Sequence, residues 1–184
     1  MKRVICTLIA LALGWGLLGC TPGGEVTTPP TVETTTPTPT PTPQFTDEEQ
    51  AVIDAVFVYL EKWTYLAQNV LNPEVDLNEI WEVADYPATN ENLLLWAAWR
   101  NLGVQLYGAP ILVPSGVSHS MVDSRGDHFR VNGCYIMTEG YLADASGNNP
   151  RENAADRLAG WFTVLRTTEG NYLVLEDKTE ETPC

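Results

Sequence analysis

Histidine and basic side chains are both scarce in this sequence. The 184 residues include two histidines, His119 and His128, and neither spacing nor neighbours suit a zinc site, so we expect no metal. Lys and Arg number 10 against 24 Asp and Glu, a formal net charge of −14, which argues against electrostatic binding of nucleic acid. Nucleophile-elbow glycines and a phosphate-binding loop with its lysine are also lacking. The sequence therefore indicates no cofactor.

Long apolar runs are lacking as well, apart from a short one near the N-terminus. Residues 4–18 are uncharged and follow two basic residues, and the run is shorter than the ~18 residues of a spanning helix. It ends in Leu17-Leu18-Gly19-Cys20, which resembles the lipobox of bacterial lipoproteins. We expect residues 1–19 to be a lipoprotein signal peptide and Cys20 to carry the acyl chains, for example palmitate, that anchor the protein to the extracytoplasmic face of the cell membrane. The alternative is an uncleaved signal anchor with an ordinary Cys20.

A stretch rich in threonine and proline follows the lipobox. Alternating Thr-Pro favours extended polyproline II, and the stretch has too few apolar side chains to form a core. We therefore expect a disordered, semi-rigid linker over residues 20–44. Residues 45–184 then form one domain, which is long enough to bury a sizeable core.

The cysteine count depends on the lipobox. Cys6 would be lost with the signal peptide and Cys20 acylated, which leaves Cys134 and Cys184. Disulfides persist outside the cytoplasm, so we expect these two to pair and to stabilise the fold by about 4 kcal/mol in the chain-entropy model. Two free thiols are the alternative.

The first half of the domain has helical periodicity. Thr46 with Glu49 forms a capping box, and apolar residues recur at spacings of three and four to about Asn69. Asp76 caps a short second helix, and Thr89 caps a third helix that Gly108 is expected to stop. The expected core face of the third helix is Leu93, Trp96, Ala97, Arg100 or Leu102, and Leu106.

The second half alternates with a period of two. Apolar and polar side chains alternate around residues 117–121, 129–137, 161–165 and 172–175, which predicts strands separated by glycine-containing turns. Helices followed by an antiparallel meander indicate an α+β fold.

Several short motifs in the second half carry a family resemblance. They are Val131-Asn132-Gly133-Cys134, Asp144-Ala145-Ser146-Gly147-Asn148, Gly170-Asn171-Tyr172-Leu173-Val174 and Thr182-Pro183-Cys184. With the order of helices and strands, they make the domain resemble the nuclear transport factor 2-like cone, and more specifically the secreted actinobacterial lipoproteins with this fold. The resemblance implies N-terminal helices packed on a curved antiparallel sheet, closed by the terminal cysteine. It departs from the usual pattern at Ile136 (often Asp) and Tyr172 (commonly Trp), and it brings no settled activity.

Enzymes on this fold, of the ketosteroid isomerase and polyketide cyclase type, use an inward carboxylate as base and a tyrosine or acid as oxyanion donor. Tyr59 is a candidate donor, and the carboxylates considered are Asp54, Glu61, Glu82, Asp123 and Glu139. Each is expected to be a solvated surface group, because acidic side chains are rarely buried unpaired. The integrin-type tripeptide Arg125-Gly126-Asp127 is typical of a turn between strands.

Aromatic residues offer the remaining candidates. Five of the six tryptophans lie in the domain, and we expect most of them in the core. One or two are expected to line a cone pocket, and the candidates are Tyr59, Trp63 and Trp96. The sequence thus favours a lipid-anchored domain without catalysis that binds an envelope protein or a small apolar ligand. An isomerase- or cyclase-type enzyme and a structural or assembly factor of the cell envelope are the alternatives. The oligomeric state is not indicated.

Overall fold

Contacts divide the chain into Met1–Thr40 and Pro41–Cys184. The computed structural model describes residues 44–136, 140–144, 146, 157–180, 182 and 184, all in the second unit. The predicted signal peptide, Cys20, nearly all of the predicted linker and Glu139 lie outside the described residues. Among the described helices, none combines the length and apolar character needed to cross a membrane.

The long helix α1 (Asp47–Gln68) begins at the predicted cap. The backbone N–H of Glu49 donates to Thr46 Oγ1 at 3.3 Å, and the backbone N–H of Thr46 donates to Glu49 Oε2 at 2.8 Å. Both bonds satisfy backbone groups that the first turn leaves free. One face of the helix is buried, and it consists of Val52, Ile53, Val56, Tyr59, Leu60, Leu66 and Ala67.

The second and third helices differ in detail from the prediction. The second is a 3-10 helix, η1 (Leu77–Glu82), and the third, α2 (Ala88–Leu102), starts one residue before Thr89. Thr89 is therefore not the cap, and Gly108 is not the stop. Gly103 ends α2 in the left-handed conformation (φ 66°), which glycine adopts without a Cβ clash.

The core face of α2 also differs. Its buried residues are Ala88, Thr89, Asn92, Trp96 and Trp99. Ala97, which was expected on this face, is exposed, and Leu106 is buried in a strand instead. The face turns toward Asn92 because that polar side chain finds hydrogen-bond partners inside, which an apolar pattern does not reveal.

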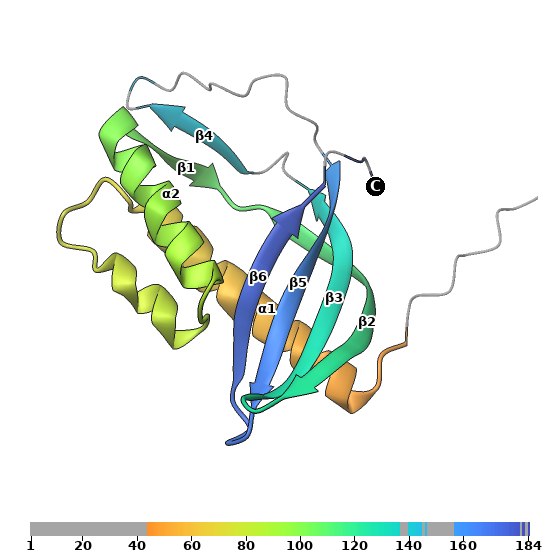
Figure 1. The fold of residues 1–184 in the computed structure, drawn as a ribbon. Coiled ribbons are helices and arrows are strands. Elements are labelled where there is room, and N and C mark those ends of the chain that lie inside the picture. Colours follow the sequence, from red (N-terminus) through yellow and green to blue (C-terminus); the bar gives the residue numbers. More distant parts are fainter. Residues whose placement is uncertain (1–43, 137–139, 145, 147–156, 181, 183) are drawn as a thin grey trace, which may run out of the picture. The chain divides into compact units, whose positions relative to one another are not determined.

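The described strands form two antiparallel sheets (Figure 1). The larger sheet has the order β2 (Ile111–Asp123), β3 (Gly126–Ile136), β5 (Arg157–Thr167) and β6 (Tyr172–Thr179). The smaller sheet pairs β1 (Val104–Gly108) with β4 (Gly140–Asp144). The sequence analysis missed both short strands, because it assigned β1 to the third helix and assigned no element to residues 140–143 of β4.

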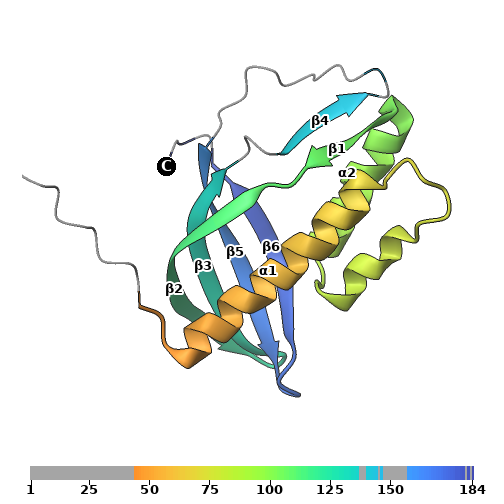
Figure 2. The same ribbon diagram turned by 180° about the vertical axis from the view of Figure 1, so that it is seen from behind.

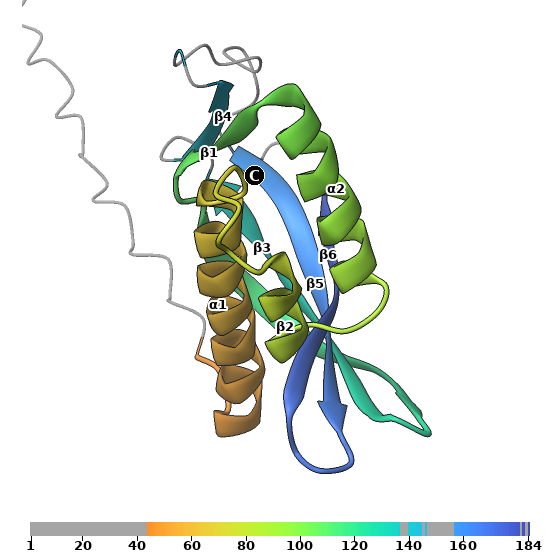
Figure 3. The same cartoon turned by 90° about the vertical axis from the view of Figure 1, so that its left-hand side faces the viewer.

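Helices α1 and α2 cover the concave face of the larger sheet (Figures 2 and 3). Figure 2 shows α1 crossing the sheet diagonally, and Figure 3 shows α2 beside it, with η1 contacting both helices. Fully buried Val131, Phe162 and Val164 of the sheet join Val52 and Val56 of α1 in one core. The predicted α+β class, with N-terminal helices packed on a curved antiparallel sheet, is confirmed.

Candidate functional site

A one-residue irregularity between β5 and β6 determines where the candidate site lies. Val164 pairs with Val174, but the preceding residue Thr163 pairs with Glu176, so Leu175 is an extra residue in β6. Side chains alternate between the two faces along a strand. The extra residue therefore reverses which residues in the rest of β6 face the core.

Asp177 faces inward as a result. It pairs with Phe162, whose side chain is fully buried, and paired residues of neighbouring strands lie on the same face of a sheet. Asp177 is itself only partly buried. The chain thus presents a carboxylate from the edge strand β6 on the helix-covered face, beside the buried Phe162.

Two tyrosines hold this carboxylate. The hydroxyl of Tyr135, on β3, donates to Asp177 Oδ1 at 2.8 Å, and the hydroxyl of Tyr59, on α1, donates to Asp177 Oδ2 at 3.3 Å. Both tyrosine side chains are buried. The three residues come from the sheet and from the helix that crosses it, so the tertiary fold alone assembles them.

Burial dominates the electrostatics of this cluster. It raises the pKa of Asp177 to about 6, against the hydrogen bonds from Tyr135 and Tyr59, which lower it. Burial also raises the pKa of Tyr59 and of Tyr135 well above their ordinary values, and the charge of Asp177 adds to this. Near neutral pH both tyrosines are therefore protonated donors, and Asp177 is a carboxylate that titrates close to the working range.

The network continues into α2. Asn92 Nδ2 donates to the hydroxyl oxygen of Tyr59 at 2.9 Å, and Trp63 Nε1 donates to Asn92 Oδ1 at 2.8 Å. Two neighbours of Asn92 on the same helix face, Thr89 and Trp96, are fully buried, yet Thr89 Oγ1 and Trp96 Nε1 have no hydrogen-bond partner in the described part of the chain. Unsatisfied buried polar atoms are uncommon and mark a place where a polar partner is favoured.

The three residues predicted to line a pocket lie in and around this network. Tyr59 and Trp96 are fully buried, and Trp63 is partly buried with its ring centroid 6.3 Å from that of Trp96 and 6.2 Å from that of Trp99. Tyr59 is also a hydroxyl donor, the role considered for it from the sequence. Whether these side chains line an open pocket stays a prediction.

The carboxylates considered from the sequence lie elsewhere. Asp54, Glu61 and Glu82 are exposed; Asp54 accepts from Gln50 Nε2 at 2.7 Å, and Glu82 pairs with Lys62 at 2.9 Å. The expectation of surface carboxylates agrees with their positions. Asp177 was not among them, so the sequence analysis missed the one described carboxylate on the inner face that bonds two buried tyrosines.

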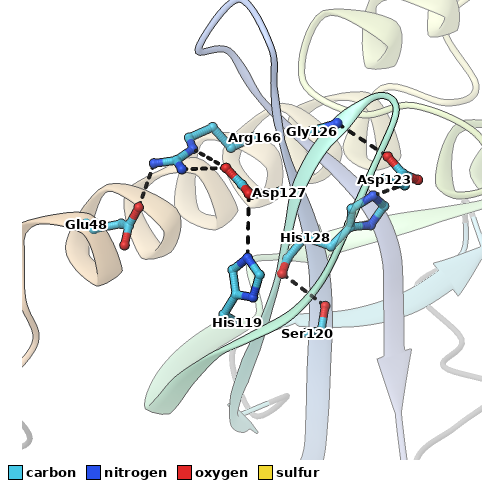
Figure 4. A network of polar contacts seen from close by, with 8 residues as sticks. All are labelled: Glu48, His119, Ser120, Asp123, Gly126, Asp127, His128 and Arg166. Carbon is cyan, nitrogen blue, oxygen red and sulfur yellow. Dashed lines mark hydrogen bonds and ion pairs between the residues drawn. The ribbon is translucent and has the colours of Figure 1, made fainter.

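The Arg125-Gly126-Asp127 tripeptide belongs to the turn between β2 and β3 (Figure 4). Asp127 accepts from Arg166 Nε at 3.2 Å, and this guanidinium holds the pKa of Asp127 below its usual value. A Cβ on Gly126 would lie 1.9 Å from the carbonyl oxygen of Arg166. These contacts give the tripeptide a structural role in the hairpin, as expected from the sequence.

The two histidines lie beside the same turn. His128 Nε2 is 3.0 Å from Asp123 Oδ2, and His119 Nε2 is 3.6 Å from Asp127 Oδ1 (Figure 4). A backbone hydrogen bond from Arg125 holds the pKa of Asp123 below its usual value, which makes this carboxylate a poor base. In the part of the chain that the structure describes, no group of three His, Cys, Asp or Glu is placed to hold a metal ion.

Cys134 and Cys184 form a disulfide with a Cα–Cα distance of 5.7 Å, the pair expected from the sequence. It joins the C-terminal residue to the outer face of β3. The backbone bonds of Ala159 with Thr182 and Glu180, each 2.8 Å long, hold these two residues against β5.

Comparisons with known proteins give no guide to activity. No protein-family model matches the chain, and no curated protein matches it. Among solved structures it is similar to the intermembrane-space region of the chloroplast protein ARC6, at 16% identity over 74% of this chain and 98% of that one, with a TM-score of 0.43. It is also similar to a structure from Catenulispora acidiphila, at 7% identity over 71% of this chain and 91% of that one (TM-score 0.44). A candidate aromatic ring hydroxylase from Novosphingobium aromaticivorans is similar at 10% identity over 74% of this chain and 91% of that one, with a TM-score of 0.41. Likenesses this distant carry no inference about function.

Proposed function

We propose that this chain is a lipid-anchored protein of the extracytoplasmic membrane face, and that its domain binds a small, largely apolar ligand through a polar group at Asp177. The anchor rests on the sequence around Cys20. The binding function rests on one observation, namely the partly exposed Asp177 carboxylate that Tyr59 and Tyr135 hold on the inner face.

The chemistry of the carboxylate defines the ligand's polar group. Each carboxylate oxygen accepts one tyrosine hydroxyl and retains lone pairs for a further donor. A hydroxyl or an amine suits this arrangement, whereas a ligand carboxylate would be repelled. The surrounding aromatic side chains suit an apolar body, as in most small-molecule sites.

The electrostatics support a functional use of Asp177. A pKa of about 6 means that ionising this group costs more in the folded protein than in water. Strongly perturbed groups of this kind concentrate at binding and catalytic sites. A ligand amine or hydroxyl would stabilise the charged form and so offset this cost.

Matched fragments test the ligand site. We expect aryl amines and aryl alcohols to bind the full chain in ligand-observed NMR, and aryl carboxylates of the same size to bind at least tenfold more weakly. Asp177→Asn should weaken amine binding at least tenfold, whereas Asp54→Asn, at an exposed carboxylate of α1, should leave it unchanged. Equal amine binding by wild type and Asp177→Asn would remove the proposal.

The anchor is tested separately. Cys20→Ser should abolish the mass increase of the acyl chains and release the protein from the membrane fraction. A variant of unshifted mass that stays in the membrane fraction would instead indicate an uncleaved signal anchor.

A proton-transfer enzyme of the isomerase or cyclase type is the second candidate, and the pKa of Asp177 favours it, because a general base works best with a pKa near the working pH. We place it second because both tyrosine hydroxyls donate to Asp177 rather than toward a substrate oxygen. Enzyme activity predicts deuterium incorporation from D₂O into an enolisable aryl ketone, followed by NMR, and its loss in Asp177→Asn. No incorporation above the buffer rate would exclude this chemistry for the ketones tested.

A further inference from the structure

A second candidate site lies on the opposite, outer face of the larger sheet. A hollow of about 270 Å³ opens there beside the disulfide, and its lining includes Ser115, Arg130, Asn132, Trp161 and Glu180. Its size lies just below the ~300–1,000 Å³ of typical small-molecule sites. The ligand must therefore be small.

Arg130 is held in place at one end of the hollow. Its guanidinium carbon lies 4.3 Å from the ring centroid of Trp161, and its Nε donates to Asn132 Oδ1 at 3.1 Å. Stacking and this hydrogen bond fix the plane of the guanidinium and leave its two terminal nitrogens available. A planar fork of this kind matches a carboxylate.

Arg130, like Arg100 and Arg157, has no acidic partner among the described residues, and of these three arginines only Arg130 lines the hollow. Lys62, Arg125, Arg166 and Lys178 each lie within ion-pair distance of a carboxylate. Within residues 44–136 and the other described segments, no carboxylate lies at that distance from Arg130. A preorganised, unpaired guanidinium in a chain of net charge −14 favours an anionic group from another molecule.

Glu180 lies at the other end of the hollow. Its backbone N–H donates to Ala159, which pairs with Cys134, four residues along β3 from Arg130. At ~3.3 Å per residue this separates the two ends by about 13 Å along the strand. Glu180 is exposed, and no described cation lies within ion-pair distance of it. The hollow therefore has a positive end and a negative end, with Trp161 and its partner Asn132 between them.

We propose that this hollow binds a short zwitterionic peptide of about three residues. An extended chain of that length spans about 10 Å, and the Arg130 side chain, which reaches toward Asn132, shortens the distance between the two charges below the ~13 Å between the backbone positions. Arg130 takes the terminal carboxylate in a bidentate pair, Glu180 takes the terminal ammonium, and the peptide lies along the hollow between these two side chains. This site is independent of Asp177, which lies on the opposite face of the sheet.

Three peptides separate the charge contributions. Tri-alanine, N-acetyl-tri-alanine and tri-alanine amide are titrated into the ¹⁵N-labelled full chain, and the indole N–H signal of Trp161 is followed. The zwitterion is expected to bind at least tenfold more tightly than either blocked peptide. Binding of all three with equal affinity, or no shift at millimolar concentration, would overturn the proposal.

Variants at the two ends assign each charge. With Arg130→Ala, tri-alanine and its amide should bind equally; with Glu180→Gln, tri-alanine and its N-acetyl form should bind equally. Arg157→Ala removes another exposed arginine, at the start of β5 and outside the lining of the hollow, and should keep the wild-type preferences. A carboxylate preference that survives Arg130→Ala would also overturn the assignment.

Discussion

The hydroxyl of Tyr135 donates a 2.8 Å hydrogen bond to Oδ1 of Asp177, between strands that are not neighbours in the sheet. β5 separates the two strands, and Gly160 of β5 lies beneath the Tyr135 ring. The absence of a side chain at Gly160 lets Tyr135 extend across β5 to the edge strand. This contact, with the one from Tyr59, places a carboxylate of raised pKa under the helices.

The free energy of unfolding should depend on pH through the titration of Asp177. Its pKa is about 6 when folded and ~3.9 in an unfolded chain, so the folded state binds this proton more tightly. The contribution of Asp177 to stability is therefore greatest below about pH 4 and falls by about 3 kcal/mol as the pH rises through 6. Relative to wild type, the free energy of unfolding of Asp177→Asn should therefore rise by this amount between pH 4 and pH 7, as measured by urea denaturation.

Asp127→Asn is the matched control, with the opposite sign. Arg166 lowers the pKa of Asp127, so the charged form contributes stability that is present above the unfolded pKa and lost at acid pH. This variant should lose stability relative to wild type at neutral pH. If the two variants showed the same pH trend, the assigned pKa of Asp177 would be wrong.

The two tyrosines should affect Asp177 unequally. Tyr135→Phe and Tyr59→Phe each remove a donor to the carboxylate, which should raise the pKa of Asp177 above 6. The rise should be larger for Tyr135→Phe, because its bond is 2.8 Å and that of Tyr59 is 3.3 Å. A ¹³C-carboxyl NMR titration measures both, and each variant should lose about 2 kcal/mol at pH 7. An unchanged pKa in both variants would contradict the described network.

Gly160 should tolerate no side chain. A Cβ there would lie 2.7 Å from the carbonyl oxygen of Lys178 and 3.0 Å from the Tyr135 ring. We expect Gly160→Ala to destabilise the domain by about 1–3 kcal/mol and to shift the pKa of Asp177 by displacing Tyr135. Gly116→Ala, where no atom lies within 4 Å of the added carbon, should cost less than about 0.5 kcal/mol. Thermal unfolding and the same NMR titration compare the two, and equal losses would argue against the close contact.

The disulfide should stabilise the domain through the unfolded state. Closing the 50-residue separation between Cys134 and Cys184 restricts the unfolded chain, so Cys134→Ser with Cys184→Ser should lose about 4 kcal/mol. Denaturation with and without reductant measures this. Reductant should destabilise wild type and leave the double variant unchanged. If wild type kept its stability after full reduction, the disulfide would not stabilise the domain.

Local patterns predicted much of the fold because they act over a few residues. The Thr46–Glu49 capping box begins α1 as expected, since both bonds close within one turn. Phe129 and Val131 face the core and Arg130 faces out, because alternation is a property of a single strand. The end of α2 was predicted wrongly, since the prediction took Gly108 as the stop, whereas the helix ends at Gly103 in the left-handed conformation and Leu106 is buried in β1.

The sequence by itself determined the cap of α1 and the strand alternation of β3, since each follows from neighbours in the chain. Only the tertiary structure decided that Asp177 faces the core. Strict alternation from buried Val174 would place Asp177 outside, and the extra residue Leu175 reverses this. That bulge exists only in the pairing of β6 with β5, and the partners Tyr59 and Tyr135 lie 118 and 42 residues away, so no local pattern specifies the cluster.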